Sequence, residues 1–377
     1  MKRAVLKKTV FVGMSGGVDS SVAALLLANS PEAQALRKKS RLPAGRQGYE
    51  VVGVFMRCYN IDGCAERDAE DARRVAGQLG IPFYVWDFEK EYKKRVVRYM
   101  IDGYRKGLTP NPDVMCNREI KFGLFFEKAR RLGADFVATG HYVRLKNGKL
   151  FTALDKNKDQ SYFLWTLAQA QLAHCLFPIG DYVKPEVRRL AKRAALATAE
   201  KKDSQGICFL GDISIREFLK KYIPEKRGVI VTPEGVKIGE HRGAWFYTIG
   251  QRQGLDLKDK NSALGIRGEH ATMPHYVVAK DVKKNIVVVA EGSENKALFR
   301  KEVELADINI ISGRKIQRRL SVRARVRYRQ PVSPAILELK KNGAHLLFKN
   351  PQKFVAEGQS AVFYSKTGEM LGGGVIV

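Results

Sequence analysis

The sequence has no long hydrophobic run. No apolar stretch in its 377 residues approaches the length of a membrane-spanning helix, and Lys7 and Lys8 interrupt the short apolar stretch near the start of the chain. We therefore expect neither a membrane span nor a signal peptide, no membrane partner, and a cytoplasmic location.

Cysteine is also scarce. An odd number of thiols in a long chain argues against a disulfide framework. Burial in apolar surroundings is the ordinary state of such a thiol, and it fits Cys175 best. The chain has five cysteines, namely Cys58, Cys64, Cys116, Cys175 and Cys208.

Two of these thiols lie in predicted loops. Cys116 ends a proline-stiffened segment ahead of a predicted helix at residues 118–132, and Cys208 lies among lysines and glycines in residues 201–211. A thiol at a helix N-terminus near Arg118 and Lys121 should ionise more easily than a free cysteine, whose pKa is about 8.5. We therefore predict that both thiols are reactive.

The common nucleotide-binding motif GxxxxGK[ST] is missing, because no lysine follows Gly17. The chain has instead the run SGGVDS at residues 15–20, between a predicted strand at 10–14 and a predicted helix at 20–28. A glycine turn that leads into a helix points backbone N–H groups and the positive end of the helix dipole at one place. This arrangement favours a phosphate site over an ordinary strand-to-helix turn.

Acidic residues are outnumbered, and one segment has none. Lys and Arg number 67 against 39 Asp and Glu, which leaves a net charge of +28, and residues 314–329 contain no carboxylate. In that segment Arg323, Arg325, Arg327 and Arg329 alternate with other residues, so a strand would place four guanidinium groups on one face. Like charges on one face repel. We predict contact with a nucleic-acid backbone, with a solvated face as the alternative.

Strands and helices alternate in the first part of the chain. Strands are predicted at residues 10–14, 51–56, 83–88 and 135–141, and helices at 20–28, 65–79, 90–104 and 118–132. The pattern predicts an α/β fold with a doubly wound parallel sheet and a ligand at the carboxyl ends of its strands. Residues 31–48 are basic and rich in turn formers, which predicts an exposed insertion without regular structure.

The pattern changes after residue 211. A short predicted helix at 214–222 precedes β-type segments, and from residue 298 short strands recur as in a small barrel, including one at 320–329. We predict three domains: a catalytic α/β domain at residues 1–212, a small, mostly β central domain at 213–297, and an RNA-binding β-barrel at 298–377.

Seven motifs along the chain resemble, in order, those of the bacterial tRNA-specific 2-thiouridylases (the MnmA family), a branch of the ATP pyrophosphatases. They are GMSGGVDSS, TPNPDVMCNREIKF, ATGHY, KDQSYFL, KDSQGICFLG, GEHRGAWFYTIGQRQGL and GQSAVFY. The resemblance implies ATP-dependent thiolation of C2 of the wobble uridine, U34, in tRNAs for Lys, Glu and Gln. It implies ATP with Mg²⁺ as cofactor, tRNA as substrate, and a cysteine desulfurase or sulfur-relay protein as persulfide donor.

The resemblance also assigns residues to roles. Cys116 is the implied nucleophile, Cys208 the implied persulfide carrier, and Asp113 a candidate acid or base. Cys116 either attacks the persulfide to release sulfide or closes a disulfide with Cys208 after the persulfide sulfur attacks the base. The implied ATP ligands are Gly13, Met14, Ser15, Gly16, Gly17, Val18, Asp19, Ser20, Met56 and Gly140. The implied tRNA contacts are Asn111, Pro112, Asp113, His141, Lys158, Asp159, Gln160, Arg327, Tyr328 and Gln359.

Three alternatives stay open from the sequence. An amide-forming ATP pyrophosphatase would share the phosphate loop but needs no paired cysteines. A non-enzymatic RNA-binding module would carry a relic of that loop. In the third alternative Asp113, Cys116 and Cys208 hold an iron–sulfur cluster with one open iron position.

Overall fold

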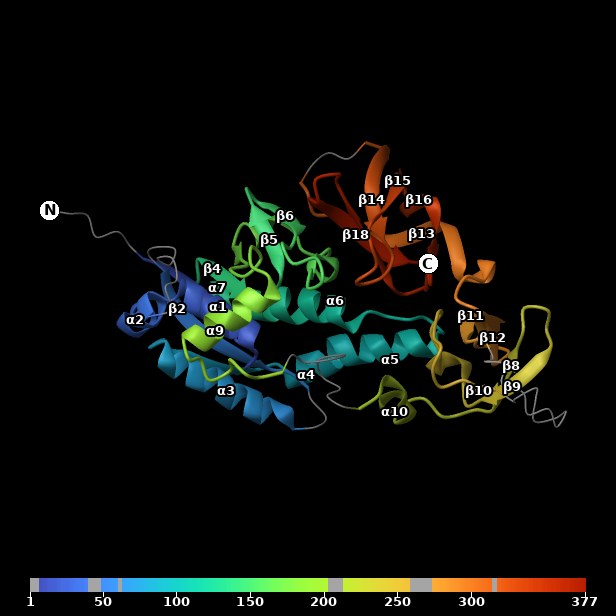
Figure 1. The fold of residues 1–377 in the computed structure, drawn as a ribbon, viewed down its shortest axis with the longest axis horizontal. Coiled ribbons are helices and arrows are strands. Elements are labelled where there is room, and N and C mark those ends of the chain that lie inside the picture. The colour runs from blue at the N-terminus through green and yellow to red at the C-terminus, as the bar shows by residue number, and fades with distance from the viewer. Residues whose placement is uncertain (1–6, 40–48, 60–62, 203–212, 258–272, 314–316) are drawn as a thin grey trace.

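The structure is a computed structural model that describes residues 7–39, 49–59, 63–202, 213–257, 273–313 and 317–377 (Figure 1). Its helical elements are α1 (Val18–Leu27), α2 (Pro31–Lys39), α3 (Cys64–Gln78), α4 (Glu89–Tyr92), η1 (Lys93–Val97), α5 (Arg98–Arg105), α6 (Pro112–Cys116), η2 (Asn117–Phe125), α7 (Phe126–Arg131), η3 (Ser161–Phe163), α8 (Gln169–Leu172), α9 (Lys184–Arg193), α10 (Ile215–Lys220), η4 (Ala244–Phe246) and η5 (Lys296–Leu298).

The strands fall into an N-terminal group, a central group and a C-terminal group. They are β1 (Lys8–Gly13), β2 (Tyr49–Arg57), β3 (Phe83–Asp87), β4 (Phe136–Thr139), β5 (Val143–Lys146), β6 (Lys149–Thr152) and β7 (Cys175–Leu176); β8 (Gly228–Val231), β9 (Lys237–His241), β10 (Asp256–Leu257), β11 (His275–Asp281) and β12 (Ile286–Glu291); and β13 (Phe299–Ile310), β14 (Arg319–Arg325), β15 (Ser333–Lys340), β16 (Gly343–Lys353), β17 (Ser360–Tyr364) and β18 (Met370–Ile376).

The first sheet is parallel and has the strand order β3-β2-β1-β4-β7. Helices cover both of its faces, because alternate residues of β1 enter different cores. Val10 and Val12 pack with residues of α1, α3 and α9, whereas Phe11 packs with residues of α5, η2 and α7. The predicted doubly wound α/β fold is therefore confirmed. The strand order runs outward in both directions from β1, so it reverses between β1 and β4, whose carboxyl ends lie side by side.

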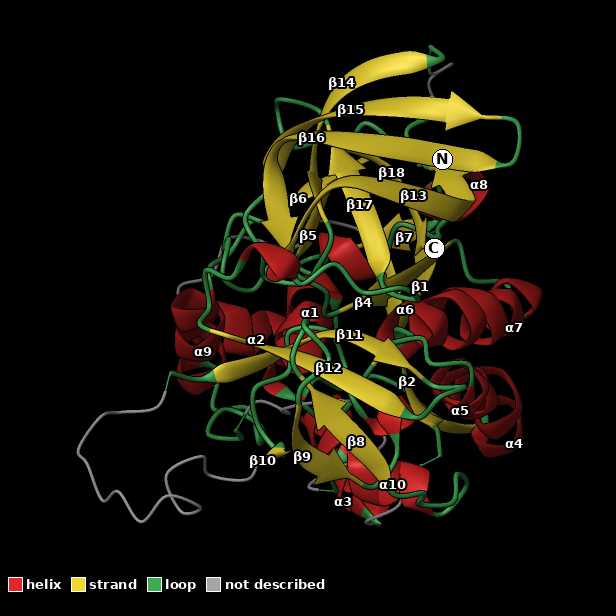
Figure 2. Cartoon of the chain, turned by 90° about the vertical axis from the view of Figure 1, so that its right-hand side faces the viewer, coloured by secondary structure: helices red, strands yellow, loops and turns green. Residues whose placement is uncertain are grey.

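The rest of the chain adds two β structures. A central sheet has the order β10-β9-β8-β12-β11, and β13-β16-β15-β14-β17-β18 close a barrel. Figure 2 shows the barrel above the central sheet, and Figure 1 shows both beside the α/β domain. The predicted central β region and C-terminal barrel are confirmed, whereas the exact domain boundaries stay a prediction.

Two predicted elements were wrong in detail. The segment at 31–48 is not wholly irregular, because α2 begins at Pro31 and ends at Lys39; residues 40–48 lie outside the described part of the chain. The helix expected from residue 118 begins earlier, at Pro112, and α6, η2 and α7 form one helical run to Arg131. Proline is favoured at the first position of a helix, and Asn111 caps this one, so the TPNPD segment starts a helix instead of forming a loop.

No helix in the described ranges is long and apolar enough to cross a membrane.

Candidate functional site

The SGGVDS segment forms a turn between β1 and α1. The Ser20 hydroxyl accepts a hydrogen bond from the Ser15 N–H at 3.1 Å and donates one to the Gly17 carbonyl at 3.1 Å, so the turn is held from inside. The first amides of an α-helix have no intrahelical carbonyl partner, and the N-cap, Gly17, has no side chain to satisfy them. The turn therefore presents backbone donors at the start of α1, as an anion site requires.

Two glycines let other segments approach this turn closely. Gly16 has φ of +72°, and a Cβ there would lie 2.3 Å from the carbonyl oxygen of Asp68 on α3. Gly140 follows β4, and a Cβ there would lie 2.6 Å from the backbone nitrogen of Ser20. The predicted ATP residue Gly140 thus lies directly against the start of α1. Met56, at the end of β2, lies by Gly13, where a Cβ would be 3.0 Å from its terminal methyl group.

A lysine that sequence reasoning missed completes the turn. Lys184, at the first position of α9, places its Nζ 2.8 Å from both carboxylate oxygens of Asp19, although 165 residues separate the two in the chain. The Tyr142 hydroxyl donates to the same carboxylate at 2.8 Å. Lys184 is buried and Asp19 is half-exposed. The cation absent after Gly17 is supplied by α9, and no local motif around Lys184 marks it as a partner of the turn.

Cys116 is placed differently from the prediction. It is the last residue of α6, 8% exposed, within an apolar cluster, rather than in an open loop. Burial raises the pKa of its thiol, although Lys121 and a hydrogen bond with Tyr92 act in the opposite direction. The expected low pKa is therefore wrong for this structure: the predicted cation is present, but loss of solvation outweighs it.

Asp113 and His141 belong to the same electrostatic group as Cys116. Burial raises the pKa of Asp113, which Lys121 lowers in part, and burial together with Lys121 lowers the pKa of His141 well below its ordinary value. The His141 imidazole is therefore neutral at physiological pH, and its Nδ1 lies 2.8 Å from the Thr139 hydroxyl. Lys121, on η2, is the cation common to all three groups.

The loop after β4 joins this group to the SGGVDS turn at residues 15–20, which we call the phosphate turn after its predicted role. The His141 ring packs near the ring of Phe122 on η2, with ring centroids 6.0 Å apart, while the hydroxyl of the next residue, Tyr142, contacts Asp19. Consecutive residues thus contact η2, which carries Lys121, and Asp19 of the SGGVDS turn, at the end of the sheet where the strand order reverses.

Cys208 lies outside the described residues, so its predicted role as persulfide carrier stays a prediction. Lys201, which the structure describes, directly precedes the KDSQGICFLG motif that contains Cys208. Its Nζ lies 2.6 Å from Asp68 and 2.5 Å from Asp71, both on α3. Since the Asp68 carbonyl faces Gly16, this motif begins beside the phosphate turn.

Most predicted tRNA residues gather where the barrel meets the α/β domain. Asn111 caps α6 by accepting from the Val114 N–H at 3.2 Å, and the Gln359 amide donates to the Thr109 carbonyl at 2.8 Å. Both Asn111 and Pro112 are buried. The centroid of the Tyr328 ring lies 4.4 Å from the centroid of the Phe163 ring.

The segment at residues 158–160 lies in the same region. The Gln160 side chain accepts a hydrogen bond from the Tyr142 N–H at 2.9 Å, and Lys158 is half-buried. Asp159 is 4% exposed, and both of its carboxylate oxygens accept bonds within the protein. Any contact of Asp159 with RNA would have to come from its main chain.

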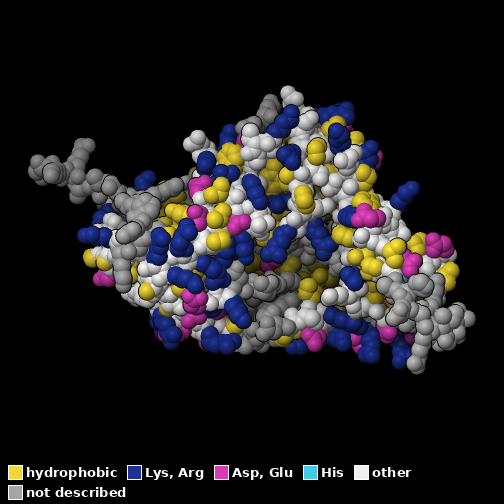
Figure 3. Space-filling model, viewed as in Figure 1, with side chains coloured by type: hydrophobic (Ala, Val, Ile, Leu, Met, Phe, Trp, Pro, Cys, Tyr) yellow, Lys and Arg dark blue, Asp and Glu magenta, His cyan; other side chains and the backbone are white. Residues whose placement is uncertain are grey.

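The predicted four-arginine face is wrong. β14 ends at Arg325, and a turn follows in which Arg329 has φ of +64°, so the two-residue alternation stops. Arg325 is 5% exposed, while Arg323, Arg327 and Arg329 are exposed. Lys and Arg side chains nevertheless predominate over Asp and Glu on the face in Figure 3, over the α/β domain and along the lower edge of the barrel.

Among the described residues, no three His, Cys, Asp or Glu side chains are grouped to hold a metal ion.

Three family models match the chain in succession. They are a tRNA methyl transferase HUP domain over residues 8–37 and 39–212, a tRNA methyl transferase PRC-barrel domain over 216–291, and an aminomethyltransferase β-barrel domain over 300–376.

Curated relatives match along the whole chain. "tRNA-specific 2-thiouridylase MnmA 2" of Geobacillus kaustophilus is 45% identical over 386 aligned residues, which cover 100% of this chain and 96% of the relative. The "tRNA-specific 2-thiouridylase MnmA" of Streptococcus agalactiae serotype III is 45% identical over 379 residues, covering 97% and 94%. Among solved structures, an NMN synthetase from Francisella tularensis matches 58% of this chain and 77% of its own, with 16% identity and a TM-score of 0.32.

Proposed function

This chain belongs to the tRNA-specific 2-thiouridylase family and is a tRNA sulfurtransferase, and from that premise we propose that it thiolates C2 of the wobble uridine U34 in tRNAs for Lys, Glu and Gln. The reaction consumes ATP and a persulfide and releases AMP and pyrophosphate. The family models carry the name of a methyl transfer, but methyl transfer needs no adenylation site. The phosphate turn and the full-length relatives both favour sulfur.

The first step is adenylation of the uridine C2 oxygen at the phosphate turn. The C2 oxygen attacks the α-phosphorus of ATP, and the bond to the leaving pyrophosphate breaks. The amides at the start of α1 and the Lys184 ammonium stabilise the negative charge of that leaving group. In the structure Lys184 is held by Asp19, so the cation is in place before ATP arrives.

The phosphate turn also fits a magnesium ion bound with ATP. Mg²⁺ prefers oxygen ligands and is commonly held by one or two carboxylates together with substrate phosphates. Asp19 is the carboxylate of the turn, half-exposed at its edge. We assign it to that ion, which would neutralise phosphate charge.

The second step transfers sulfur, and two routes are chemically balanced. In one, the Cys116 thiolate attacks the inner sulfur of a Cys208 persulfide, sulfide leaves, and sulfide displaces AMP from C2. In the other, the outer persulfide sulfur displaces AMP, and Cys116 then attacks the Cys208 sulfur to free the thiouridine. Both end in a Cys116–Cys208 disulfide, which a thiol reductant must reduce.

Cys116 has to lose its proton before either attack. Burial raises the pKa of Cys116 and also that of Asp113, so neither group is charged as easily as in water. We assign Asp113 as the acid or base that takes up this proton, with Lys121 stabilising the resulting negative charge. Asp113, which bears the carboxyl group, and Cys116, which bears the thiol, both lie on the helix α6.

The other predicted partners complete the proposal. The tRNA contacts come from the Asn111–Asp113 and 158–160 segments and from His141, Arg327, Tyr328 and Gln359, and the persulfide comes from a cysteine desulfurase or sulfur-relay protein. Because its substrate is tRNA, we place the reaction in the cytoplasm.

The observation that carries the proposal is the link from the Asp19–Lys184 pair through Tyr142 and His141 to the Cys116 group. The test is mass spectrometry of tRNA nucleosides from cells without this gene, with and without the gene restored. We expect 2-thiouridine to disappear and to return. Unchanged 2-thiouridine in the deletion strain would refute the proposal.

A second experiment tests the alternative in which the site holds an iron–sulfur cluster. Anaerobic purification and a visible spectrum would reveal such a cluster.

A further inference from the structure

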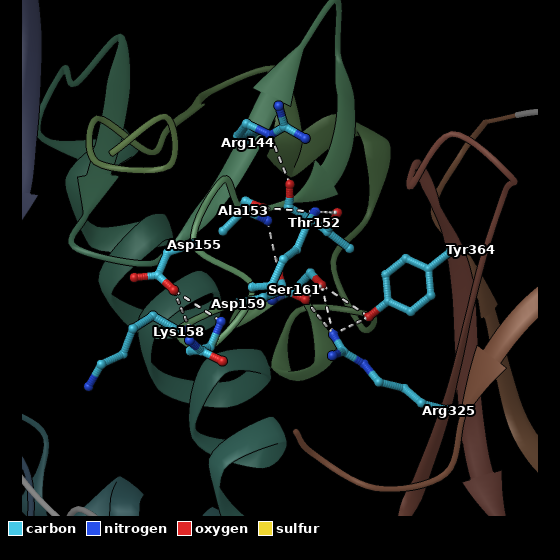
Figure 4. Close-up of polar contacts among 11 residues, drawn as sticks. Arg144, Thr152, Ala153, Asp155, Lys158, Asp159, Ser161, Arg325 and Tyr364 are labelled. Atoms are coloured by element: carbon cyan, nitrogen blue, oxygen red, sulfur yellow. Dashed lines mark hydrogen bonds and ion pairs between the residues drawn. The ribbon is translucent and has the colours of Figure 1, made fainter. Parts of the chain in front are cut away.

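A buried polar cluster joins the α/β domain to the barrel (Figure 4). Arg325, at the end of β14, places Nη2 2.6 Å from Oδ2 of Asp159. The same nitrogen lies 3.1 Å from the Ser161 hydroxyl and 2.7 Å from the Tyr364 hydroxyl of β17. We call Asp159, Ser161, Arg325 and Tyr364 the interdomain cluster. All four side chains are at most 5% exposed.

The cluster is closed by hydrogen bonds among its own members. The Ser161 hydroxyl donates to Asp159 at 3.0 Å and lies 3.0 Å from the Tyr364 hydroxyl. Burial raises the pKa of Tyr364 to about 12, so the phenol keeps its proton. Oδ1 of Asp159 accepts from the backbone N–H groups of Ala153 and Ser161, at 3.0 and 3.2 Å. The carboxylate therefore fixes the 153–161 segment as well as the arginine.

Such a cluster is poorly suited to a purely stabilising role. Removing two charges from water costs several kcal/mol per ion, and apolar replacements of buried ion pairs are often neutral or stabilising. The Nε of Arg325 is buried without a hydrogen-bond partner among the described residues, which adds to this cost. What the cluster does provide is a defined orientation, because a single nitrogen, Nη2 of Arg325, can reach Asp159, Ser161 and Tyr364 together in only one placement of the side chain.

Asp159 and Arg325, the two charged members of the cluster, each have predicted tRNA contacts next to them in the chain. Lys158 and Gln160 flank Asp159, and Figure 4 shows the Lys158 side chain extending away from Arg325. Arg327 and Tyr328 follow Arg325 in the turn after β14, with Arg327 exposed. The ion pair therefore sets how far apart, and in what orientation, the two groups of contacts lie.

We propose that the Asp159–Arg325 pair is a positioning device, which holds the barrel contacts Arg327 and Tyr328 in register with Lys158 and Gln160 so that one tRNA meets both groups. This inference rests on the proposed function, since it takes tRNA as the ligand. Arg325 itself does not touch RNA, contrary to the expectation for the arginine strand.

The interface has other bonds that should keep altered proteins folded. The Tyr162 hydroxyl donates to the Ser360 carbonyl at 2.8 Å, and the Trp165 indole donates to the Ser360 hydroxyl at 3.0 Å. Asn309 of β13 donates to the Leu167 carbonyl at 2.9 Å. Loss of the ion pair should therefore loosen the orientation of the barrel without releasing it.

The test measures the Kd of the full-length protein for unmodified tRNA, which requires no turnover. We expect Arg325→Lys and Asp159→Asn each to raise Kd about tenfold, the size of coupling common within one polar network. The matched control is Arg319→Lys on the same strand, where Arg319 pairs with Glu338 at 3.1 Å on the surface; its Kd should not change. If the charged-pair variants do not fold, Kd is measured instead for Tyr364→Phe, which keeps the side-chain volume.

A positioning role predicts non-additivity, which a loss of folded protein does not. In a background that carries both Arg327→Ala and Tyr328→Ala, Arg325→Lys should change Kd by less than about twofold, because the contacts it places are already gone. Equal fold-changes in both backgrounds, or an unchanged Kd for Arg325→Lys alone, would overturn the proposal. Absence of 2-thiouridine formation by the unaltered protein would refute the proposed function while leaving this coupling measurable.

Discussion

The phosphate side and the thiol side of the site are prepared to different degrees. On the phosphate side, Asp19, Lys184 and Tyr142 already form their polar contacts, at 2.8 Å each. On the thiol side, Cys116 is 8% exposed in an apolar cluster, and burial raises its pKa. The polar groups of the proposed phosphate site are thus already in place, whereas the proposed nucleophile is protected and protonated.

This difference matches the order of the proposed reaction. Adenylation comes first and requires fixed donors that do not reorganise during the step. An ionised thiol would be exposed to oxidation while no persulfide is present. We infer that Cys116 becomes reactive only after the substrates change its surroundings.

The largest expected effect is loss of the thiol. Cys116→Ser should abolish 2-thiouridine formation, because serine cannot attack a persulfide to form a disulfide, while tRNA affinity stays nearly intact. The measurement is nucleoside mass spectrometry after incubation with a persulfide donor. Cys175→Ser is the matched control, since Cys175 is buried in β7 away from the proposed chemistry; it should keep turnover. Wild-type turnover by Cys116→Ser would refute the two-cysteine mechanism.

The next largest effect is expected from removal of Lys184, the cation at the phosphate turn. Lys184→Met should slow tRNA-dependent pyrophosphate release about 100-fold, the usual cost of losing one preorganised donor to a developing charge. Asp19→Ala should also block this step. Lys192→Met on the same helix removes only a surface pair with Glu200, 2.9 Å away, and should have no effect. Normal pyrophosphate release from Lys184→Met would remove this residue from the site.

Thiol alkylation should vary with pH in a way that reports the burial of Cys116. Because the folded protein raises this pKa, the thiolate fraction at any given pH is smaller than in a free cysteine, and the alkylation rate should reach half its maximum only at a pH above about 8.5, the pKa of a free cysteine. Peptide mass spectrometry after iodoacetamide treatment gives the rate. A half-maximal rate below pH 8 in the free protein would show an activated thiol and contradict the contrast drawn above.

The smallest expected effect concerns one exposed arginine. Arg327→Ala should weaken tRNA binding and flatten the slope of log Kd against log salt by about one unit, if Arg327 neutralises one phosphate. ATP binding should not change. An unaltered slope and affinity would mark Arg327 as a solvated charge and direct the search for RNA contacts toward Lys158 and His141.

Local patterns predicted the parts of the molecule that depend on neighbouring residues. Strand and helix alternation predicted the α/β fold, and the SGGVDS run predicted the turn that leads into α1, because both follow from short-range geometry. Lys184 was missed because only the packing of α9 against α1 brings it to Asp19.

Long-range contacts also explain the two main errors. The alternation at Arg325 resembled a charged face, but Asp159 provides a buried partner from another domain. The basic residues near Cys116 suggested an ionised thiol, but a helical run starting at Pro112 buries it. In both cases the burial of the side chain depended on segments distant in the sequence.

The central claim is that ATP activates the uridine C2 oxygen, and isotope transfer tests it most directly. A tRNA labelled with ¹⁸O at C2 of U34 is incubated with the protein, ATP and a persulfide donor, and the released AMP is analysed by mass spectrometry. Since the C2 oxygen leaves bonded to the α-phosphorus, the account predicts one ¹⁸O atom in each AMP formed with 2-thiouridine. Unlabelled AMP accompanying 2-thiouridine would contradict it.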